Sequence, residues 1–275
     1  MTKQLPWLLQ NDGRSIPQIG LGVDGTGNEA AATAIEKALE LGYRSIDTAA
    51  FYANERGVGD GIRRSGIPRE EVHVTTKIWG DSHGSETAAA AFERSLATLG
   101  LDYVDLYLIH WPQPKQDRYV ETWQTLEKIH AEGRARSIGV SNFQPRHLLR
   151  LFQETTVRPV VNQIEVHPGF QNERLRQFNA EHNVLTQAWS PLGRGTVRGN
   201  PELAAIARKH SRSLVQVVLR WHMEIGNAVI PKTVTPARMK ENIDIFDFQL
   251  DAHDHSIIRS LERGRRTGHD PDDFG

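Results

Sequence analysis

The 275-residue sequence contains no cysteine, which excludes disulfide bonds, thiolate nucleophiles and thiolate metal ligands. No stretch approaches the roughly 18 consecutive apolar residues that a membrane-spanning helix needs, and the start, MTKQLPWLLQNDG, lacks the pattern of a secretory signal. The formal net charge is only −1, so overall charge gives no support for a nucleic-acid or anionic-membrane partner. These absences predict a cytoplasmic protein that binds neither nucleic acid nor membrane.

Short apolar segments typical of strands alternate with amphipathic helical segments along the chain, about 20 to 35 residues apart. Strict alternation over eight strands predicts a parallel sheet. The eight segments are IGLGV, RSIDTA, HVTTKIW, VDLYLIH, SIGVSN, VVNQIEV, VLTQAWS and AVIPKT, and they end near Gly22, Asp47, Lys77, His110, Asn142, Gln163, Ser190 and Lys232.

Two closures of such a sheet compete, an open doubly wound sheet and a closed barrel. A (β/α)8 barrel takes about 250 residues, which suits a chain of 275. The stretch WLLQNDGRSIPQI reads as a β-hairpin with Asp12-Gly13 at its turn. We therefore predict an α/β fold, a (β/α)8 TIM barrel over residues 1–275 as a single domain, with the N-terminal hairpin closing the bottom. Residues 264–275 are predicted to form a loose tail or flap.

The polar residues at the strand ends predict where a site lies, because the carboxyl ends of barrel strands converge on the face that carries active sites. Each residue alone has an ordinary explanation. Asp47 can cap the next helix, Lys77 can lie on an exposed edge, and His110 can be a core histidine. Seven such residues on one rim are harder to explain without a site.

Asp47, Tyr52, Lys77 and His110 also form a chemically coherent group. A phenol has an unperturbed pKa of about 10, and an adjacent ammonium lowers that pKa by favouring the tyrosinate. Lys77 can supply the charge, Asp47 can hold it in place, and His110 can orient a substrate carbonyl. The group predicts a general acid that protonates a carbonyl oxygen. The alternative is a structural ion pair between Asp47 and Lys77.

Six stretches resemble motifs of the aldo-keto reductase family, in the family's order and over nearly the whole chain. They are GYRSIDTAAFYANERGVG (42–59), LYLIHWP (106–112), RSIGVSNF (136–143), NQIEVHP (162–168), WSPLG (189–193) and IPKTVTPARMKEN (230–242). The short segment after Gly193 resembles the bacterial 2,5-diketo-D-gluconate reductase-like branch. The resemblance implies an NADPH-dependent carbonyl reductase that works as a monomer.

The resemblance also implies roles for individual residues. Tyr52 is implied as the proton donor, Lys77 and Asp47 as the groups that lower its pKa, and His110 as the group that orients the carbonyl. The implied cofactor contacts are Ser141, Asn142 and Gln163 at the nicotinamide carboxamide; Trp189 beneath the ring; Ser190, Leu192 and Gly193 along the pyrophosphate; Lys232, Thr233 and Arg238 around the 2′-phosphate; Glu241 and Asn242 beside the adenine; and Gly22, Val23, Asp47, Ile230 and Val234.

Two cations and a hydroxyl suit a phosphate dianion, because they give charge-assisted hydrogen bonds. The alternative for KTVTPARMKEN is a helix start with a solvated basic face. A second ambiguity concerns GLGVDG (20–25), which matches the G-x-G-x-x-G fingerprint of a Rossmann domain. The family resemblance places this loop beside the active site instead, and makes the fingerprint a coincidence.

The predicted substrate pocket comprises Asp24, Trp79, His110 and Trp111. Asp24 stands near a position that is aromatic in many members of the family, so it can repel acidic substrates or bind hydroxyls; alternatively it points into solvent. Small aldehydes, ketones, α-dicarbonyls and keto-sugars are the expected substrates. A redox-sensing regulatory module on the same barrel, with little turnover, is the alternative function. No H-E-x-x-H or comparable spacing occurs, so no metal is predicted.

Overall fold

The computed structural model describes residues 5–275, and its centre is one sheet of eight parallel strands in the order β10-β9-β8-β7-β6-β5-β4-β3. Their bounds are β3 Leu21–Gly22, β4 Ser45–Asp47, β5 His73–Ile78, β6 Val104–Ile109, β7 Ala135–Ser141, β8 Val161–Glu165, β9 Leu185–Trp189 and β10 Ala228–Val229. The first and last strands meet, since Gly20 N donates to Val229 O and Val229 N donates to Gln18 O, each at 2.8 Å. The predicted closed barrel is therefore confirmed.

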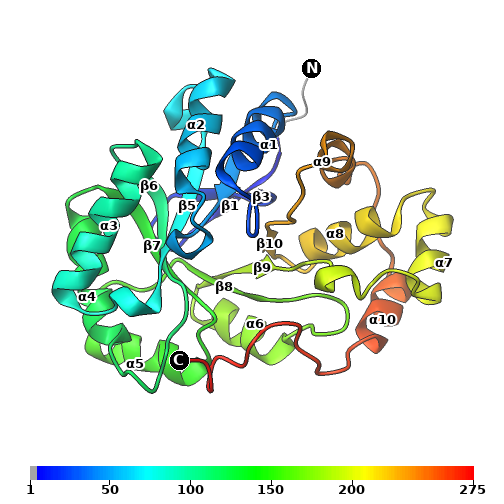
Figure 1. Ribbon diagram of the computed structural model, residues 1–275. Helices are drawn as coiled ribbons and strands as arrows, with labels where there is room; N and C mark the ends of the chain where they lie inside the picture. The colour runs from blue at the N-terminus through cyan, green and yellow to red at the C-terminus, as the bar shows by residue number, and fades with distance from the viewer. Residues whose placement is uncertain (1–4) are drawn as a thin grey trace.

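Helices surround the sheet (Figure 1). They are α1 Asn28–Glu40, α2 Glu55–Ser65, α3 Ser85–Leu99, α4 Tyr119–Ala131, α5 Pro145–Glu154, α6 Glu173–Glu181, α7 Pro201–Lys209, α8 Leu214–Glu224, α9 Pro236–Ile243 and α10 Ala252–Ser260. Short 3-10 turns are η1 Ala50–Tyr52, η2 Arg69–Glu71, η3 Gly80–Ser82 and η4 Gly193–Gly195. No helix within residues 5–275 is both long and apolar enough to cross a membrane.

The stretch SETAAAAFERSLATLG (85–100) predicts a helix with Ser85 as its N-cap and Gly100 just past its end. The start differs by one residue, because α3 begins at Ser85 and its cap is Gly84. The reason is that α4 satisfies the first amides of α3. Gly84 N donates to Thr122 Oγ1 at 2.9 Å and Ser85 N donates to Glu121 Oε1 at 2.8 Å. A neighbouring helix thus does the work that a capping side chain normally does.

The N-terminal hairpin closes the lower end of the barrel, as predicted. Strands β1 Trp7–Leu9 and β2 Ser15–Pro17 pair antiparallel. Ile16 is fully buried and clusters with Leu106, Leu108 and Val161 inside the barrel. Ser137 at the lower end of β7 donates to Asp12 Oδ2 at 2.6 Å. An apolar side chain and a polar turn together seal this end.

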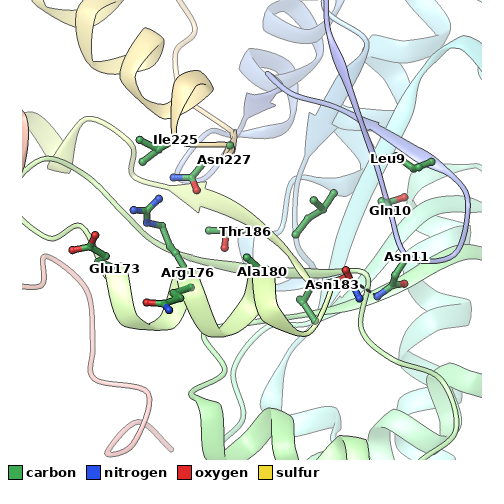
Figure 2. A pocket seen from close by; sticks show the side chains of 14 residues that line it. Leu9, Gln10, Asn11, Glu173, Arg176, Ala180, Asn183, Thr186, Ile225 and Asn227 are labelled. Atoms are coloured by element: carbon green, nitrogen blue, oxygen red, sulfur yellow. Dashed lines mark hydrogen bonds between the residues drawn. The ribbon is translucent and has the colours of Figure 1, made fainter. Parts of the chain in front are cut away.

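A cavity of about 790 Å³ opens beside this hairpin (Figure 2). It is bounded by the hairpin, α6, β9 and the α8–β10 connection. Its lining residues are Leu9, Gln10, Asn11, Glu173, Arg176, Gln177, Ala180, Asn183, Val184, Leu185, Thr186, Ile225, Gly226 and Asn227. None of the predicted site residues is among them, because those residues follow the opposite ends of the strands.

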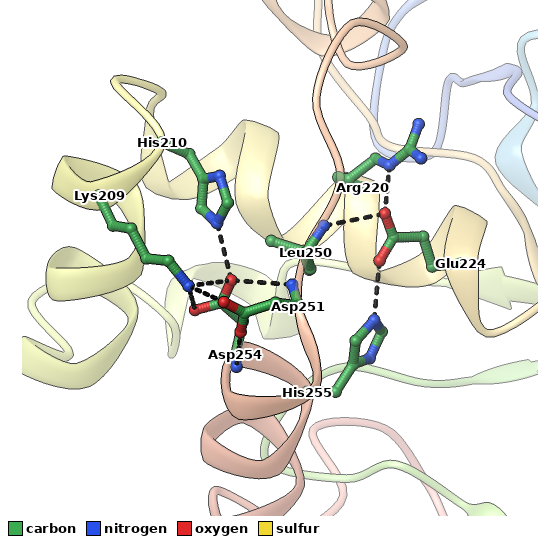
Figure 3. Close-up of polar contacts among 8 residues, drawn as sticks. All are labelled: Lys209, His210, Arg220, Glu224, Leu250, Asp251, Asp254 and His255. Carbon is green, nitrogen blue, oxygen red and sulfur yellow. Dashed lines mark hydrogen bonds and ion pairs between the residues drawn. The ribbon is translucent and has the colours of Figure 1, made fainter.

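Helix α10 is fixed to α7 and α8 by two buried or half-buried carboxylates (Figure 3). Asp254 is 1% exposed and accepts bonds from Lys209 Nζ at 2.9 Å and His210 Nε2 at 2.7 Å. Glu224 accepts from Arg220 Nε at 2.6 Å and His255 Nε2 at 2.7 Å. Beyond α10 the chain passes α6 and ends near α5 (Figure 1). The origin of the C-terminal segment is therefore firmly anchored.

Candidate active site

A buried ion pair lies at the centre of the predicted site. Lys77 on β5 is fully buried and Asp47 on the neighbouring β4 is 2% exposed, with 2.5 Å between Nζ and Oδ1. Nζ also donates to the Thr48 carbonyl at 2.8 Å. Gln163, from β8 across the barrel, donates through Nε2 to Asp47 Oδ2 at 2.7 Å and to Gln187 Oε1 at 2.7 Å. Both charges are thus hydrogen-bonded, as buried charges must be.

Burial acts on the two members of the pair in opposite directions. Loss of solvent raises the pKa of Asp47, and the adjacent Lys77 charge opposes that shift. Loss of solvent lowers the pKa of Lys77, and Asp47 opposes it in turn. Removing either partner would leave an uncompensated charge in the interior.

Tyr52 lies beside both the ion pair and His110. The Lys77 ammonium is 5.1 Å from the centroid of the half-buried Tyr52 ring. The His110 ring is 5.6 Å from that centroid and nearly perpendicular to it. Burial, and then the charge of Lys77, hold the pKa of His110 well below its usual value, so the imidazole is neutral. Its Nδ1 is buried and bonds to nothing within residues 5–275.

The pKa of Tyr52 departs from the sequence-based expectation. Loss of solvent raises it well above 10, and the charges of Asp47 and Asp24 raise it further, while Arg194 opposes them. The Lys77 ammonium is paired with Asp47 at 2.5 Å, so the charge of Asp47 balances its charge. The phenol in this structure therefore keeps its proton at neutral pH.

Asn142, at the end of β7, organises the middle of the rim. Its Nδ2 donates to the His110 carbonyl and to Ser141 Oγ, each at 3.0 Å, and its Oδ1 accepts from Trp189 Nε1 at 2.8 Å. Ser141 Oγ donates to the Gln163 carbonyl at 2.8 Å. Asn142 and Ser190 have φ values of 64° and 47°, in the left-handed region. Backbone strain of this kind clusters at functional sites.

Of the residues predicted around a phosphate, Lys232 and Thr233 lie on the β10–α9 connection and Arg238 lies in the first turn of α9. Lys232 and Arg238 are exposed, and within residues 5–275 neither has a carboxylate within 4.0 Å. The buried Thr233 accepts from Thr235 N at 3.1 Å through its hydroxyl. Two unpaired cations beside a hydroxyl suit an anionic ligand. Of the remaining predicted contacts, Val234 is exposed, Glu241 and Leu192 are half-buried, and Val23, Gly193, Ile230 and Asn242 are buried.

The glycines of GLGVDG are explained by barrel closure. A Cβ on Gly20 would lie 2.7 Å from Ser45 Oγ, and one on Gly22 would lie 2.9 Å from the Ile230 carbonyl. Gly25 has a φ of +65° in an open turn. The first two glycines allow close packing of β3 against its neighbours, and the parallel barrel excludes the Rossmann interpretation.

Aromatic side chains form a wall above Tyr52 and His110. Trp79 lies 5.1 Å from the His110 ring and stacks on the exposed Phe51 at 3.9 Å. The ring centroid of Phe274, the residue before the last, lies 4.5 Å from that of Trp111 and 6.0 Å from that of Trp79. Trp79 and Trp111 were predicted, but Phe51 and Phe274 were not. Phe51 directly precedes Tyr52 in the sequence, so its position next to the predicted proton donor could have indicated it as a pocket residue.

Comparison with known proteins agrees with this geometry. Residues 18–263 match the aldo/keto reductase family. The chain is 49% identical to the methylglyoxal reductase DkgA of Escherichia coli K12, over 96% of each. It is 51% identical to the 9,11-endoperoxide prostaglandin H2 reductase of Trypanosoma cruzi, over 94% of this chain and 92% of that one. A Bombyx mori aldo-keto reductase in complex with NADP has a TM-score of 0.91 at 38% identity, covering 98% of this chain and 96% of that one.

The chain therefore belongs to the aldo/keto reductase family, a class of NADP(H)-dependent oxidoreductases. The similarity to DkgA confirms the 2,5-diketo-D-gluconate reductase-like branch that the sequence motifs indicated.

Proposed function

We propose that this chain reduces small aldehydes, ketones, α-dicarbonyls or keto-sugars with NADPH, and that Tyr52 gives the proton to the carbonyl oxygen. One observation carries the proposal. The centroid of the Tyr52 ring lies 5.1 Å from the Lys77 ammonium and 5.6 Å from the centroid of the His110 ring, on the rim where barrel active sites lie. The name of the Escherichia coli relative, methylglyoxal reductase, supports a small dicarbonyl as substrate.

The protonation states of Tyr52 and His110 and the charges of Asp47 and Lys77 determine what each side chain can do in the reaction. The Tyr52 phenol is protonated at neutral pH, so it has a proton to give when negative charge develops on the carbonyl oxygen. Burial raises its pKa and makes it a weaker acid, so the growing basicity of that oxygen must drive the transfer. Neutral His110 can donate a hydrogen bond to that oxygen without adding a charge. The Asp47–Lys77 pair fixes a dipole beneath the phenol. Phe51 and Trp79 stack on each other beside His110 and offer an apolar surface to the substrate.

The rim fits NADPH. Its nicotinamide would supply the hydride. Trp189, held by Asn142, offers a flat platform for the nicotinamide ring. Lys232 and Arg238 are exposed cations with no ion-pair partner among residues 5–275, so they are free to bind the 2′-phosphate. The complex of the Bombyx mori relative with NADP supports this assignment.

Replacing Tyr52 by Phe tests the proton donor. We expect kcat for methylglyoxal with NADPH to fall by about 10²- to 10⁴-fold, while the Kd of NADPH stays within about twofold. Tyr103→Phe is the matched control, because that phenol lies outside the site. Wild-type turnover by Tyr52→Phe would disprove the assignment. Tight NADPH binding by the wild type without turnover of any aldehyde, dicarbonyl or keto-sugar would favour the redox-sensing module.

A further inference from the structure

Glu165 is a buried carboxylate that the proposed chemistry does not use. It is the last residue of β8, is 1% exposed, and lies two residues after Gln163. Burial alone raises its pKa, but hydrogen bonds from His167, Thr267 and Gly268 outweigh burial and hold the pKa at about 2. Burying a carboxylate is unfavourable unless hydrogen bonds compensate for the lost solvent, so the partners of Glu165 indicate its role.

The carboxylate binds the C-terminal segment 264–275. Its Oε1 accepts from Thr267 N at 2.6 Å and from Thr267 Oγ1 at 2.5 Å, and Oε2 accepts from Gly268 N at 3.1 Å. His167 Nε2 completes the set, 3.1 Å from Oε1. The segment has no helix or strand of its own. Its backbone at this point is thus held by one side chain from the barrel.

The part of the segment that Glu165 binds also lies against Trp189. Glu165 and Trp189 are register partners on β8 and β9, and a Cβ on Gly268 would lie only 2.4 Å from Trp189 Cη2. The opposite end of the indole is fixed where Nε1 donates to Asn142 at 2.8 Å. The indole is therefore held at both ends, and Glu165 sets one of them.

The segment continues from this contact to the aromatic wall. Asp272 pairs with Arg146 on α5 at 2.7 Å, and the Asp273 carbonyl accepts from Lys115 Nζ at 2.8 Å. These two contacts are exposed, so each contributes little. Phe274 then packs on Trp111. The buried carboxylate is the strongest of the attachments that bring Phe274 to the site.

We propose that Glu165 is a positioning residue, which ties segment 264–275 to the barrel rim and thereby fixes both the Trp189 platform and the Phe274 wall. This inference rests on the proposed function for its kinetic consequence. Its structural part, the attachment of the segment, can be measured without any substrate or cofactor.

The first experiment compares Glu165→Gln with the wild type by trypsin digestion of the full chain. Arg266 is half-buried and directly precedes Thr267, so cleavage after Arg266 requires Thr267 to leave Glu165 and enter the protease. We expect it to be about tenfold faster in the variant, because the amide is a weaker acceptor and its NH2 opposes the donors of Thr267 and Gly268. Glu127→Gln is the matched control. Glu127 also accepts a threonine N–H, the same threonine's hydroxyl and the next residue's N–H, but on the α4–α5 side.

The second measurement is the split between KM and kcat. We expect the KM for methylglyoxal and the Kd of NADPH to rise about three- to tenfold in Glu165→Gln, with kcat within about twofold, because Tyr52 and its partners are untouched. Gly268→Ala tests the contact between the segment and Trp189. Its Cβ would lie 2.4 Å from Trp189 Cη2 and 3.3 Å from Glu165 Oε2, so we expect NADPH binding to weaken and trypsin cleavage to become faster.

Equal cleavage rates in Glu165→Gln, Glu127→Gln and the wild type would overturn the proposal. If Glu165→Gln fails to fold, Thr267→Val, which removes one donor, replaces it, and cleavage about threefold faster is expected. A wild type without turnover would disprove the proposed function only, because faster cleavage and a changed tryptophan fluorescence in Glu165→Gln would still support the attachment.

Discussion

Asp24 shows how an exposed charge influences a buried site. Its side chain lies on the surface of the β3–α1 loop, yet its charge raises the pKa of Tyr52 and of Asp47. The two sequence-based alternatives, a solvent-facing turn residue and a residue that acts on the pocket, are therefore compatible. An uncompensated carboxylate near the mouth also repels anionic substrates.

Replacing Asp24 by Asn should change substrate preference. We expect kcat/KM for an anionic carbonyl compound such as a diketogluconate to rise about three- to tenfold, while kcat/KM for neutral methylglyoxal changes less than twofold, since one partly screened charge is removed. Steady-state assays at low and high salt check this. The gain should shrink at high salt, and a gain that is independent of salt would contradict the electrostatic explanation.

Single residues also mark where sequence reasoning ended. Asp47, Lys77 and His110 were predicted together because each interrupts an apolar strand at its end. Glu165 and Gln187 carry the same signal, a polar residue inside an apolar segment, but were not selected. Phe274 offered no local signal at all. Its place on Trp111 results from packing between segments far apart in the sequence, which no local pattern encodes.

At the scale of elements, α9 and the connection before it carry the residues that we propose bind the 2′-phosphate. Arg238→Ala should raise the Kd of NADPH about 10- to 100-fold and that of NADH less than threefold, because only NADPH has the 2′-phosphate. Lys240→Ala is the matched control, an exposed cation on the same helix outside the predicted contacts. Fluorescence titration of both cofactors measures the effect. Equal losses for the two cofactors would place Arg238 elsewhere.

Strands were easier to predict than helix ends. All eight strand segments were found because each is apolar and lies between turn signals. Gly100 follows the last residue of α3, and Pro201 is the first residue of α7, a position that suits proline because its missing N–H would have no partner there. Ser85 was misread because Glu121 and Thr122, from another helix, satisfy the α3 amides. Helix starts that depend on tertiary partners have no complete local signature.

At the scale of the whole molecule, Glu165 links stability to pH. Its pKa is about 2 in the folded chain and about 4.3 when exposed. A lowered folded pKa adds stability that is fully present above about pH 5 and disappears as the pH falls towards 2. The advantage of the wild type over Glu165→Gln in free energy of unfolding should therefore shrink by about 2 kcal/mol over that range. Urea unfolding at pH 6, 4 and 2.5 measures it; a constant difference would contradict the assigned pKa.

The hydrogen bonds that join Val229 to Gly20 and Gln18 have a consequence for biosynthesis. The ring of strands cannot shut until the eighth strand has left the ribosome, more than 200 residues after the first. Until then one edge of β3 has no partner strand, and the barrel interior around the Asp47 carboxylate is incomplete. A chain interrupted before residue 228 would keep that edge, which is the kind of surface that recruits other chains into aggregates.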